Sequence, residues 1–309
     1  MRILFLGTSE FAVPTLEALA ASRTHEIIAV VTQPDRPQGR GLRVSMPPVK
    51  QTAERLGLPI LQPKRVRAEP FLETAGEMKP DVLVLAAFGQ IIPQALLDLP
   101  PFGPINVHGS LLPLYRGAAP IQYAILNGEK ITGITTMWMD ATLDTGDILL
   151  QREVPIGDDD TTGTLIPKMA AAGAELLIET LDRLAARNCP RIPQDHSKAT
   201  FAPSITPADT EIDWNEPAGR IRNRIRALSP RPGAFAMMNG RKIKIWSAEV
   251  REDLPGQPGE VLAVTKQSVD VGAWQGALSL SEVQPENSRR MTAPEWARGA
   301  RLAPGEKFD

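Results

Sequence analysis

The feature that most constrains the fold is an apolar run followed by an amphipathic segment and then by a second apolar run. Residues 2–7 are mostly apolar and end at a glycine, residues 11–21 are amphipathic, and residues 26–32 are again apolar. Short apolar runs of this length indicate strands, and the segment between them indicates a helix. Because parallel neighbours need such a crossover, the opening of the chain predicts a parallel sheet.

Later segments predict further strands of the same domain. Residues 81–87 are almost purely apolar, which is typical of a strand buried on both faces. Residues 105–108 and the β-branched segment 131–139 are strand candidates, and residues 148–154 are expected to pair with the latter. Residues 162–187 are rich in alanine and leucine and predict a helix that closes the domain. The expected fold class is α/β, with a Rossmann-like, mostly parallel sheet.

The composition changes near residue 190. Residues 188–210 carry four prolines and several small polar residues, which is typical of a linker. A chain of 309 residues also exceeds what one core usually holds. We expect a catalytic domain over residues 1–189, a linker over 190–207 and a second domain over 208–309. In the second domain a helix at 217–228 precedes several short strand-like runs, which predict a small β-barrel or sandwich.

Charge and rare residues exclude several classes of protein. The net charge is −2 and the pI is about 6.0, so any nucleic-acid surface must come from local clustering. The single cysteine, Cys189, excludes an intrachain disulfide, and His25, His108 and His196 lack zinc spacing, so we expect no metal site. We expect His25 at the surface and His196 in solvent. No stretch approaches 18 apolar residues, so we expect no membrane span, a cytoplasmic location and no evident protein partner.

Asn106 and His108 stand two residues apart at the end of a predicted strand. In a strand both side chains leave on the same face, while Val107 faces the other way. Gly109 is expected to end the strand. Ligands of open α/β sheets bind beyond the carboxyl ends of the strands, so we expect both side chains at the functional edge of the sheet.

A second polar cluster, residues 140–147, follows another predicted strand. If the two strands are neighbours, a carboxylate of this cluster can approach His108. Such a group suits acyl transfer to an amine, because the amide can donate to an oxyanion, the imidazole can act as an acid or a charged stabiliser, and the carboxylate can orient it. The alternative is structural: Asn-x-His alone is a weak motif, and Asp144 can simply make an Asx turn.

Two stretches resemble the signatures of the folate-dependent formyltransferases: NVHGSLLPLYRG at residues 106–117 and LDTGD at residues 143–147. The resemblance covers nearly the whole chain and is strongest to members that formylate methionine on initiator tRNA. It implies a Rossmann-like formyltransferase domain, a C-terminal OB-type barrel and 10-formyltetrahydrofolate as the formyl donor. The other matching stretches are residues 2–12, 32–41, 225–234 and 284–291.

The resemblance also implies roles for individual residues. The catalytic group would be Asn106, His108 and Asp144. The transfer would be direct, with a neutral amine as the attacking group and no covalent enzyme intermediate. The residues implied for the reduced folate are Ser110, Leu111, Leu112 and Pro113, with Phe88 and Gly89 in a second wall.

Two basic segments are candidates for contact with tRNA. The loop at residues 33–50 is too long for an ordinary connection and holds Arg36, Arg40 and Arg43, of which Arg40 is expected to make the main contact. The second segment, residues 220–244, has eight cationic residues, and no acid occurs from 217 to 248. Its expected contacts are Arg222, Arg226 and Lys242. The alternative for this segment is a solvated helix face.

The sequence is also compatible with other functions. A related enzyme could formylate a purine precursor, a sugar-nucleotide amine or water, although a purine-pathway enzyme would need neither basic segment. A dinucleotide-dependent oxidoreductase is disfavoured because Gly7 is not followed by the other glycines of G-x-G-x-x-G. A non-catalytic RNA-binding protein would not need Asn106, His108 and Asp144. The chain departs from the family pattern at Arg231, where a tryptophan is expected.

Overall fold

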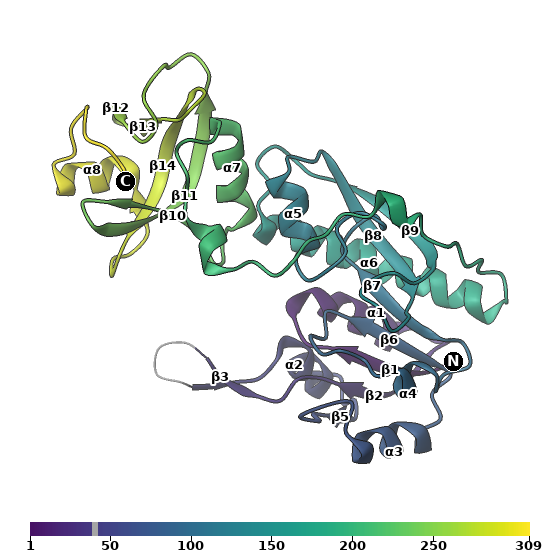
Figure 1. Cartoon of the computed structure of the whole chain (residues 1–309). Coiled ribbons are helices and arrows are strands. Elements are labelled where there is room, and N and C mark those ends of the chain that lie inside the picture. The colour runs from purple at the N-terminus through teal and green to yellow at the C-terminus, as the bar shows by residue number, and fades with distance from the viewer. Residues whose placement is uncertain (39–42) are drawn as a thin grey trace. The chain divides into compact units, whose positions relative to one another are not determined.

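The computed structural model describes residues 1–38 and 43–309, and the chain divides into two compact units (Figure 1). Helix α5 (Pro120–Leu126) and the start of helix α6 (Thr162–Ala185) fall largely in the second unit, although they precede the predicted linker. Unit 1 comprises Met1–Pro120, Ile131–Pro155 and Ile166–Ala202, and unit 2 comprises Ile121–Lys130, Ile156–Leu165 and Pro203–Asp309.

Unit 1 contains a seven-stranded sheet in the order β5-β2-β1-β6-β7-β8-β9. The first five strands of this order are parallel to their neighbours, and β8 and β9 are antiparallel. The predicted mostly parallel sheet is therefore confirmed. The strands are β1 (Arg2–Gly7), β2 (Glu26–Val31), β5 (Ile60–Leu61), β6 (Val82–Ala86), β7 (Pro104–His108), β8 (Ile131–Trp138) and β9 (Ile148–Pro155).

The strand order places a switch point beside β1. After β1 the chain builds β2 and β5 on one side and then β6 and β7 on the other, so the carboxyl ends of β1, β6 and β7 share one edge. This is where open α/β sheets bind ligands. The helices of unit 1, in addition to most of α6, are η1 (Glu10–Ala12), α1 (Val13–Ala21), α2 (Pro48–Arg55), α3 (Glu69–Glu77), α4 (Gln94–Leu97) and η2 (His196–Lys198).

A short antiparallel ribbon stands where the sequence predicted a long loop. It consists of β3 (Arg36–Gln38) and β4 (Arg43–Ser45) and extends away from the sheet (Figure 1). At its base Asp35 accepts hydrogen bonds from Lys50 (2.6 Å) and Gln62 (2.8 Å). These bonds hold the pKa of the Asp35 carboxyl below its usual value and tie the ribbon to the body of unit 1.

Unit 2 is built around an antiparallel sheet in the order β10-β11-β14-β13-β12, with β15 pairing to β14. Helix α7 (Ala218–Ala227) packs on β11 and buries Ile221 and Ile225. The strands are β10 (Ala234–Met238), β11 (Arg241–Arg251), β12 (Val261–Val264), β13 (Val269–Gly272), β14 (Ala277–Pro285) and β15 (Met291–Thr292), and the remaining helices are η3 (Pro207–Thr210) and α8 (Ala293–Ala300).

Three aromatic rings close the core of unit 2 on the α8 side. The ring of Phe308 lies 5.2 Å from that of Trp214 and 6.0 Å from that of Trp296. Within the two described ranges of the chain, no helix is long and apolar enough to cross a membrane.

Candidate active site

Strand β7 brings Asn106 and His108 to one face of the sheet. Both side chains are buried, and between them Val107 faces the opposite side, where it lies against Gly173 of α6. Among the residues that the structure describes, none forms a hydrogen bond with the side-chain amide of Asn106. A buried amide that the fold does not use is available to a ligand.

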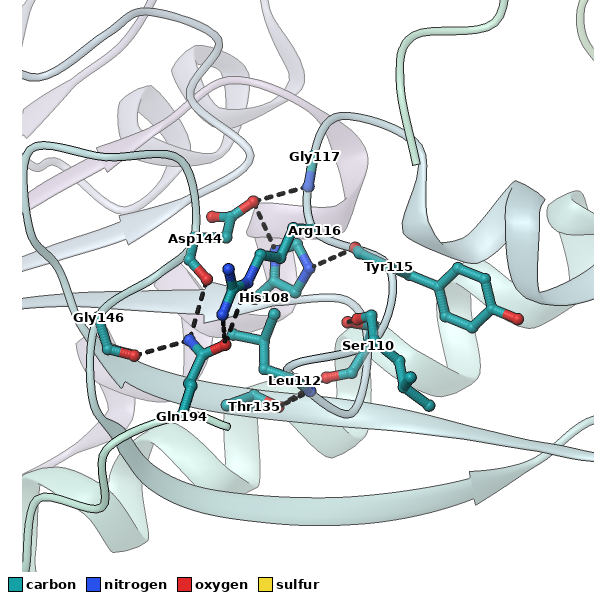
Figure 2. Close-up of polar contacts among 11 residues, drawn as sticks. His108, Ser110, Leu112, Tyr115, Arg116, Gly117, Thr135, Asp144, Gly146 and Gln194 are labelled. Carbon is teal, nitrogen blue, oxygen red and sulfur yellow. Dashed lines mark hydrogen bonds and ion pairs between the residues drawn. The ribbon is translucent and has the colours of Figure 1, made fainter. Parts of the chain in front are cut away.

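Both ring nitrogens of His108 face oxygen atoms (Figure 2). Nε2 lies 3.0 Å from the carbonyl oxygen of Tyr115, and Nδ1 lies 3.7 Å from Oδ2 of Asp144. A carbonyl oxygen can only accept, so Nε2 carries a hydrogen and donates it to Tyr115. The distance of 3.7 Å between Nδ1 and Asp144 is too long for a hydrogen bond. Nδ1 is therefore the ring nitrogen that can interact with a reacting group, and it lies near the carboxylate.

Asp144 lies in the loop between β8 and β9 and has a left-handed backbone, with φ of 52°. Its Oδ2 accepts a hydrogen bond from the backbone N–H of Gly117 at 2.8 Å, and its side chain is only 12% exposed. The sequence predicted that a carboxylate of this loop would approach His108 if the strands were neighbours. The structure brings Asp144 there, because β7 and β8 pair directly.

Arg116 is a buried cation that the sequence analysis did not single out. Its Nε and Nη2 donate to Oε1 of Gln194 at 3.2 and 2.6 Å, and Nη2 also donates to Nδ1 of His196 at 3.0 Å. The backbone of Arg116 bonds to Thr200 and Ala202. Arg116 belongs to the signature of residues 106–117, so the sequence could have identified it as a site residue. Gln194 lies in the predicted linker, where no motif pointed to a functional residue.

The loop after β7 carries four of the residues predicted for the folate. Ser110 is fully buried, and its hydroxyl donates to the carbonyl of Leu114. The backbone N–H of Leu112 donates to Oγ1 of Thr135 at 3.0 Å, and the Leu112–Pro113 peptide is cis. Of these four residues, Leu111 and Pro113 are partly exposed, so their side chains are the ones that a ligand can contact.

Phe88 and Gly89 follow β6 at the same edge of the sheet. The Phe88 ring is 1% exposed and packs in the core with Leu85 and Ile92, so a contribution from Phe88 to a ligand site would come from its backbone. Gly89 is exposed with φ of 84°. Ile91 is 90% exposed and presents an apolar side chain beside this loop.

The residues predicted to bind tRNA differ in their surroundings. In unit 1, exposed Arg36 donates to Oε1 of Gln33 at 3.0 Å. Arg40 lies outside the described residues, and Arg43 is described only as part of the backbone of β4.

In unit 2 the predicted cations also have partners within the fold. Arg222 pairs with Asp159 at 2.8 Å. Arg226 donates to the carbonyls of Gly157 and Asp160, and its burial lowers the pKa of its guanidinium. The ammonium of Lys242 lies 3.7 Å from the centre of the Phe235 ring.

Comparison with known proteins decides the family. A formyl transferase family model matches residues 1–181, and a model of the formyl transferase C-terminal domain matches residues 204–301. A methionyl-tRNA formyltransferase of Acetivibrio thermocellus is 48% identical over 308 residues, which cover 99% of each chain. The chain belongs to the methionyl-tRNA formyltransferase family. The resemblance inferred from residues 106–117 and 143–147 is thereby confirmed.

Solved structures share the fold of these formyltransferases. HypX from Aquifex aeolicus, solved in complex with tetrahydrofolic acid, is 20% identical with a TM-score of 0.64. The match covers 99% of this chain and 48% of HypX, so this chain spans about half of that protein. An N-formyltransferase from Helicobacter canadensis, in complex with folinic acid and dTDP-3-aminofucose, is 19% identical with a TM-score of 0.68, covering 90% of this chain and 98% of that one. At these identities the likeness concerns the fold alone.

Proposed function

We propose that the protein transfers the formyl group of 10-formyltetrahydrofolate to the amino group of methionine on initiator tRNA, for translation initiation. The observation that carries this proposal is the similarity to a methionyl-tRNA formyltransferase along the whole length, through both units. A cytoplasmic location is part of the same proposal, because charged initiator tRNA is used there. The proposed domains are a catalytic domain over residues 1–189, a linker over 190–207 and an OB-type tRNA-binding domain over 208–309.

The proposed catalytic group is Asn106, His108 and Asp144. The neutral amine attacks the formyl carbon, so a new C–N bond forms, the bond from that carbon to the folate nitrogen breaks, and one amine proton is transferred to the departing nitrogen. The amide of Asn106 and, when the imidazole carries a second proton, Nδ1 of His108 donate to the formyl oxygen as it gains negative charge. Asp144 stabilises a positive charge on His108 and can accept the amine proton on its way.

The surroundings of this group fit a reduced folate. A bound heterocycle needs apolar walls and a few convergent polar groups. Exposed apolar side chains follow the two strands that end at this edge, namely Ile91 after β6 and Leu114, which is 39% exposed, after β7, and Gly89 is exposed as well. We propose that Ser110, Leu111, Leu112 and Pro113, with the backbone of Phe88 and Gly89, hold the folate and present its formyl group to Asn106 and His108. The donor supplies an activated formyl carbon.

The proposed tRNA contacts in unit 1 are Arg36 and Arg43 of the β3–β4 ribbon, together with Arg40, which falls between them in the sequence. Those in the basic segment of unit 2 are Arg222, Arg226 and Lys242. Backbone phosphates attract such cations, and each lost contact lowers the dependence of affinity on salt. Lys242 is the best residue to substitute in unit 2. Arg222 and Arg226 also bond to residues 157–160, so replacing either of them would change the fold as well as the charge.

Lys242→Glu should therefore weaken tRNA binding and reduce the salt slope. The matched control is Lys266→Glu, an exposed lysine of the same unit that lies outside the basic segment. Equal affinities and equal salt slopes for the two variants would remove Lys242 from the proposed surface.

The acceptor is tested by supplying formyl-labelled 10-formyltetrahydrofolate together with methionyl initiator tRNA, a sugar-nucleotide amine or a purine-precursor amine. The proposal expects label on the tRNA and release of one tetrahydrofolate for each formyl group transferred. Transfer to the sugar nucleotide or the purine precursor, with none to the tRNA, would retain the formyl-transfer site but overturn the proposed acceptor.

A further inference from the structure

The segment expected to be a linker packs on unit 1 over residues 191–202. Ile192 and Ile148 exchange two backbone hydrogen bonds, at 2.8 and 2.9 Å. Arg191 pairs with Asp147 at 2.9 Å. The segment therefore lies against the loop that carries Asp144, and its far end lies beside Arg116.

Gln194 is a buried residue of this segment, although its neighbours on both sides are exposed. Its amide oxygen accepts both hydrogen bonds from Arg116. Its amide nitrogen donates to the carbonyls of Asp144, at 2.9 Å, and Gly146, at 2.7 Å (Figure 2). The oxygen and the nitrogen of this amide are thus both hydrogen-bonded, the oxygen to the loop that carries Arg116 and the nitrogen to the loop that carries Asp144.

Those two loops also hold Asp144 itself. The left-handed backbone of Asp144 is unusual for a residue other than glycine, and the bond from Gln194 holds its carbonyl in that conformation. The carboxylate in turn accepts from the N–H of Gly117, which directly follows Arg116. Gln194 therefore supports Asp144 in two ways. Its amide nitrogen bonds to the Asp144 carbonyl, and its amide oxygen holds Arg116, the residue before the Gly117 N–H that bonds to the carboxylate.

We propose that Gln194 is a positioning residue for formyl transfer: its amide holds the Asp144 loop and Arg116 together so that Asp144 faces Nδ1 of His108. The inference rests on the proposed function. Gln194 lies outside both family-model matches, between residues 181 and 204. It acts through Asp144 and does not itself touch the reacting atoms.

The test is a double-mutant cycle between Gln194→Met and Asp144→Asn, with single-turnover transfer from 10-formyltetrahydrofolate to methionyl initiator tRNA as the readout. Methionine preserves the length of the side chain and removes its hydrogen bonds. In the wild-type background we expect a loss of about 10- to 100-fold in rate, the scale for misplacing a catalytic group, while the KM values stay nearly constant. In the Asp144→Asn background we expect less than about 2-fold further loss. An equal loss in both backgrounds would overturn the inference.

A second variant separates the two halves of the amide. Gln194→Glu retains the acceptor for Arg116 and removes the donor to Asp144 and Gly146, so it should lose as much rate as Gln194→Met. If Gln194→Met does not fold, Gln194→Glu takes its place in the cycle. A Gln194→Glu enzyme with wild-type rate would show that the donor half is not needed, which overturns the inference.

The control is Asp195→Asn, next in the chain. Asp195 is exposed and caps the short helix η2 by accepting hydrogen bonds from Ser197; within the described part of the chain its other partner is Lys198, not the Asp144 loop. The Asp195→Asn enzyme should transfer the formyl group at the wild-type rate. That result would exclude general loosening of the segment as the cause of the loss in the Gln194 variants. The proposed function is tested separately: if Asp144→Asn alone retains full activity, the catalytic assignment fails, whereas a slow Asp144→Asn with additive Gln194 losses refutes only the inference.

Discussion

Replacing Asp144 with asparagine removes one charge from the candidate site with little change in shape. Asparagine tolerates the left-handed backbone of this position and can still accept the Gly117 N–H. For a full charge on His108 at 3.7 Å, the attraction is about 4.5 kcal/mol at an effective dielectric constant of about 20 and about 1 kcal/mol in bulk water. Both side chains are mostly buried, at 6% and 12% exposure, so the higher value is closer.

If most of that attraction is needed as charge develops, Asp144→Asn should slow transfer by about 10²- to 10³-fold, because each factor of ten corresponds to about 1.4 kcal/mol. The assay is single-turnover transfer at saturating 10-formyltetrahydrofolate and methionyl initiator tRNA. Asp140→Asn is the matched control, since this exposed carboxylate of the same loop bonds, among the residues that the structure describes, only to Thr142 and Thr145. A folded Asp144→Asn enzyme as fast as the Asp140→Asn control would refute the electrostatic role.

Three further predictions concern other residues of unit 1. Asn106→Ala should slow single-turnover transfer by about 10²- to 10³-fold, the usual loss for one oxyanion donor, and near-normal turnover in the folded variant would exclude that role. Gly146→Ala would drive a Cβ into the carbonyl oxygen of Trp138, so the free energy of unfolding in urea should fall by about 1–3 kcal/mol, and an unchanged midpoint would contradict this packing. Burial of His25, assisted by the N-terminal ammonium and opposed by Asp182, lowers its pKa below 6.5, so the unfolded chain binds more protons and stability falls as the pH drops through that value. His25→Leu should flatten this dependence in urea unfolding at pH 7 and below, and an unchanged slope would contradict it.

The sequence was sufficient for the parts of the fold that depend on local pattern. The apolar runs predicted β1, β2, β6 and β7, because a strand buried on both faces has no polar alternation. The placement of Asn106 and His108 followed from the period of two along a strand. Bringing Asp144 to His108 required the further assumption that β7 and β8 are neighbours, which the structure confirms.

Three other features that depend on long-range contacts were not predicted. Gln194 sits in a proline-rich stretch with no periodicity, and its partners are 78 residues and about 50 residues away along the chain. His25 was expected at the surface, and that expectation was wrong, because packing against other elements leaves its side chain 1% exposed. The β3–β4 ribbon was also missed, since two three-residue strands in a loop rich in proline and glycine carry little local signal.

Whether the acceptor is the methionyl amine on initiator tRNA can be measured by comparing three substrates that carry the same amine. These are methionyl initiator tRNA, methionyl elongator tRNA and free methionine, each supplied with labelled 10-formyltetrahydrofolate. If initiator tRNA is the acceptor, transfer should be rapid to the initiator species and slow to the other two. Equal transfer to all three, or loss of the formyl group without transfer to any, would contradict it.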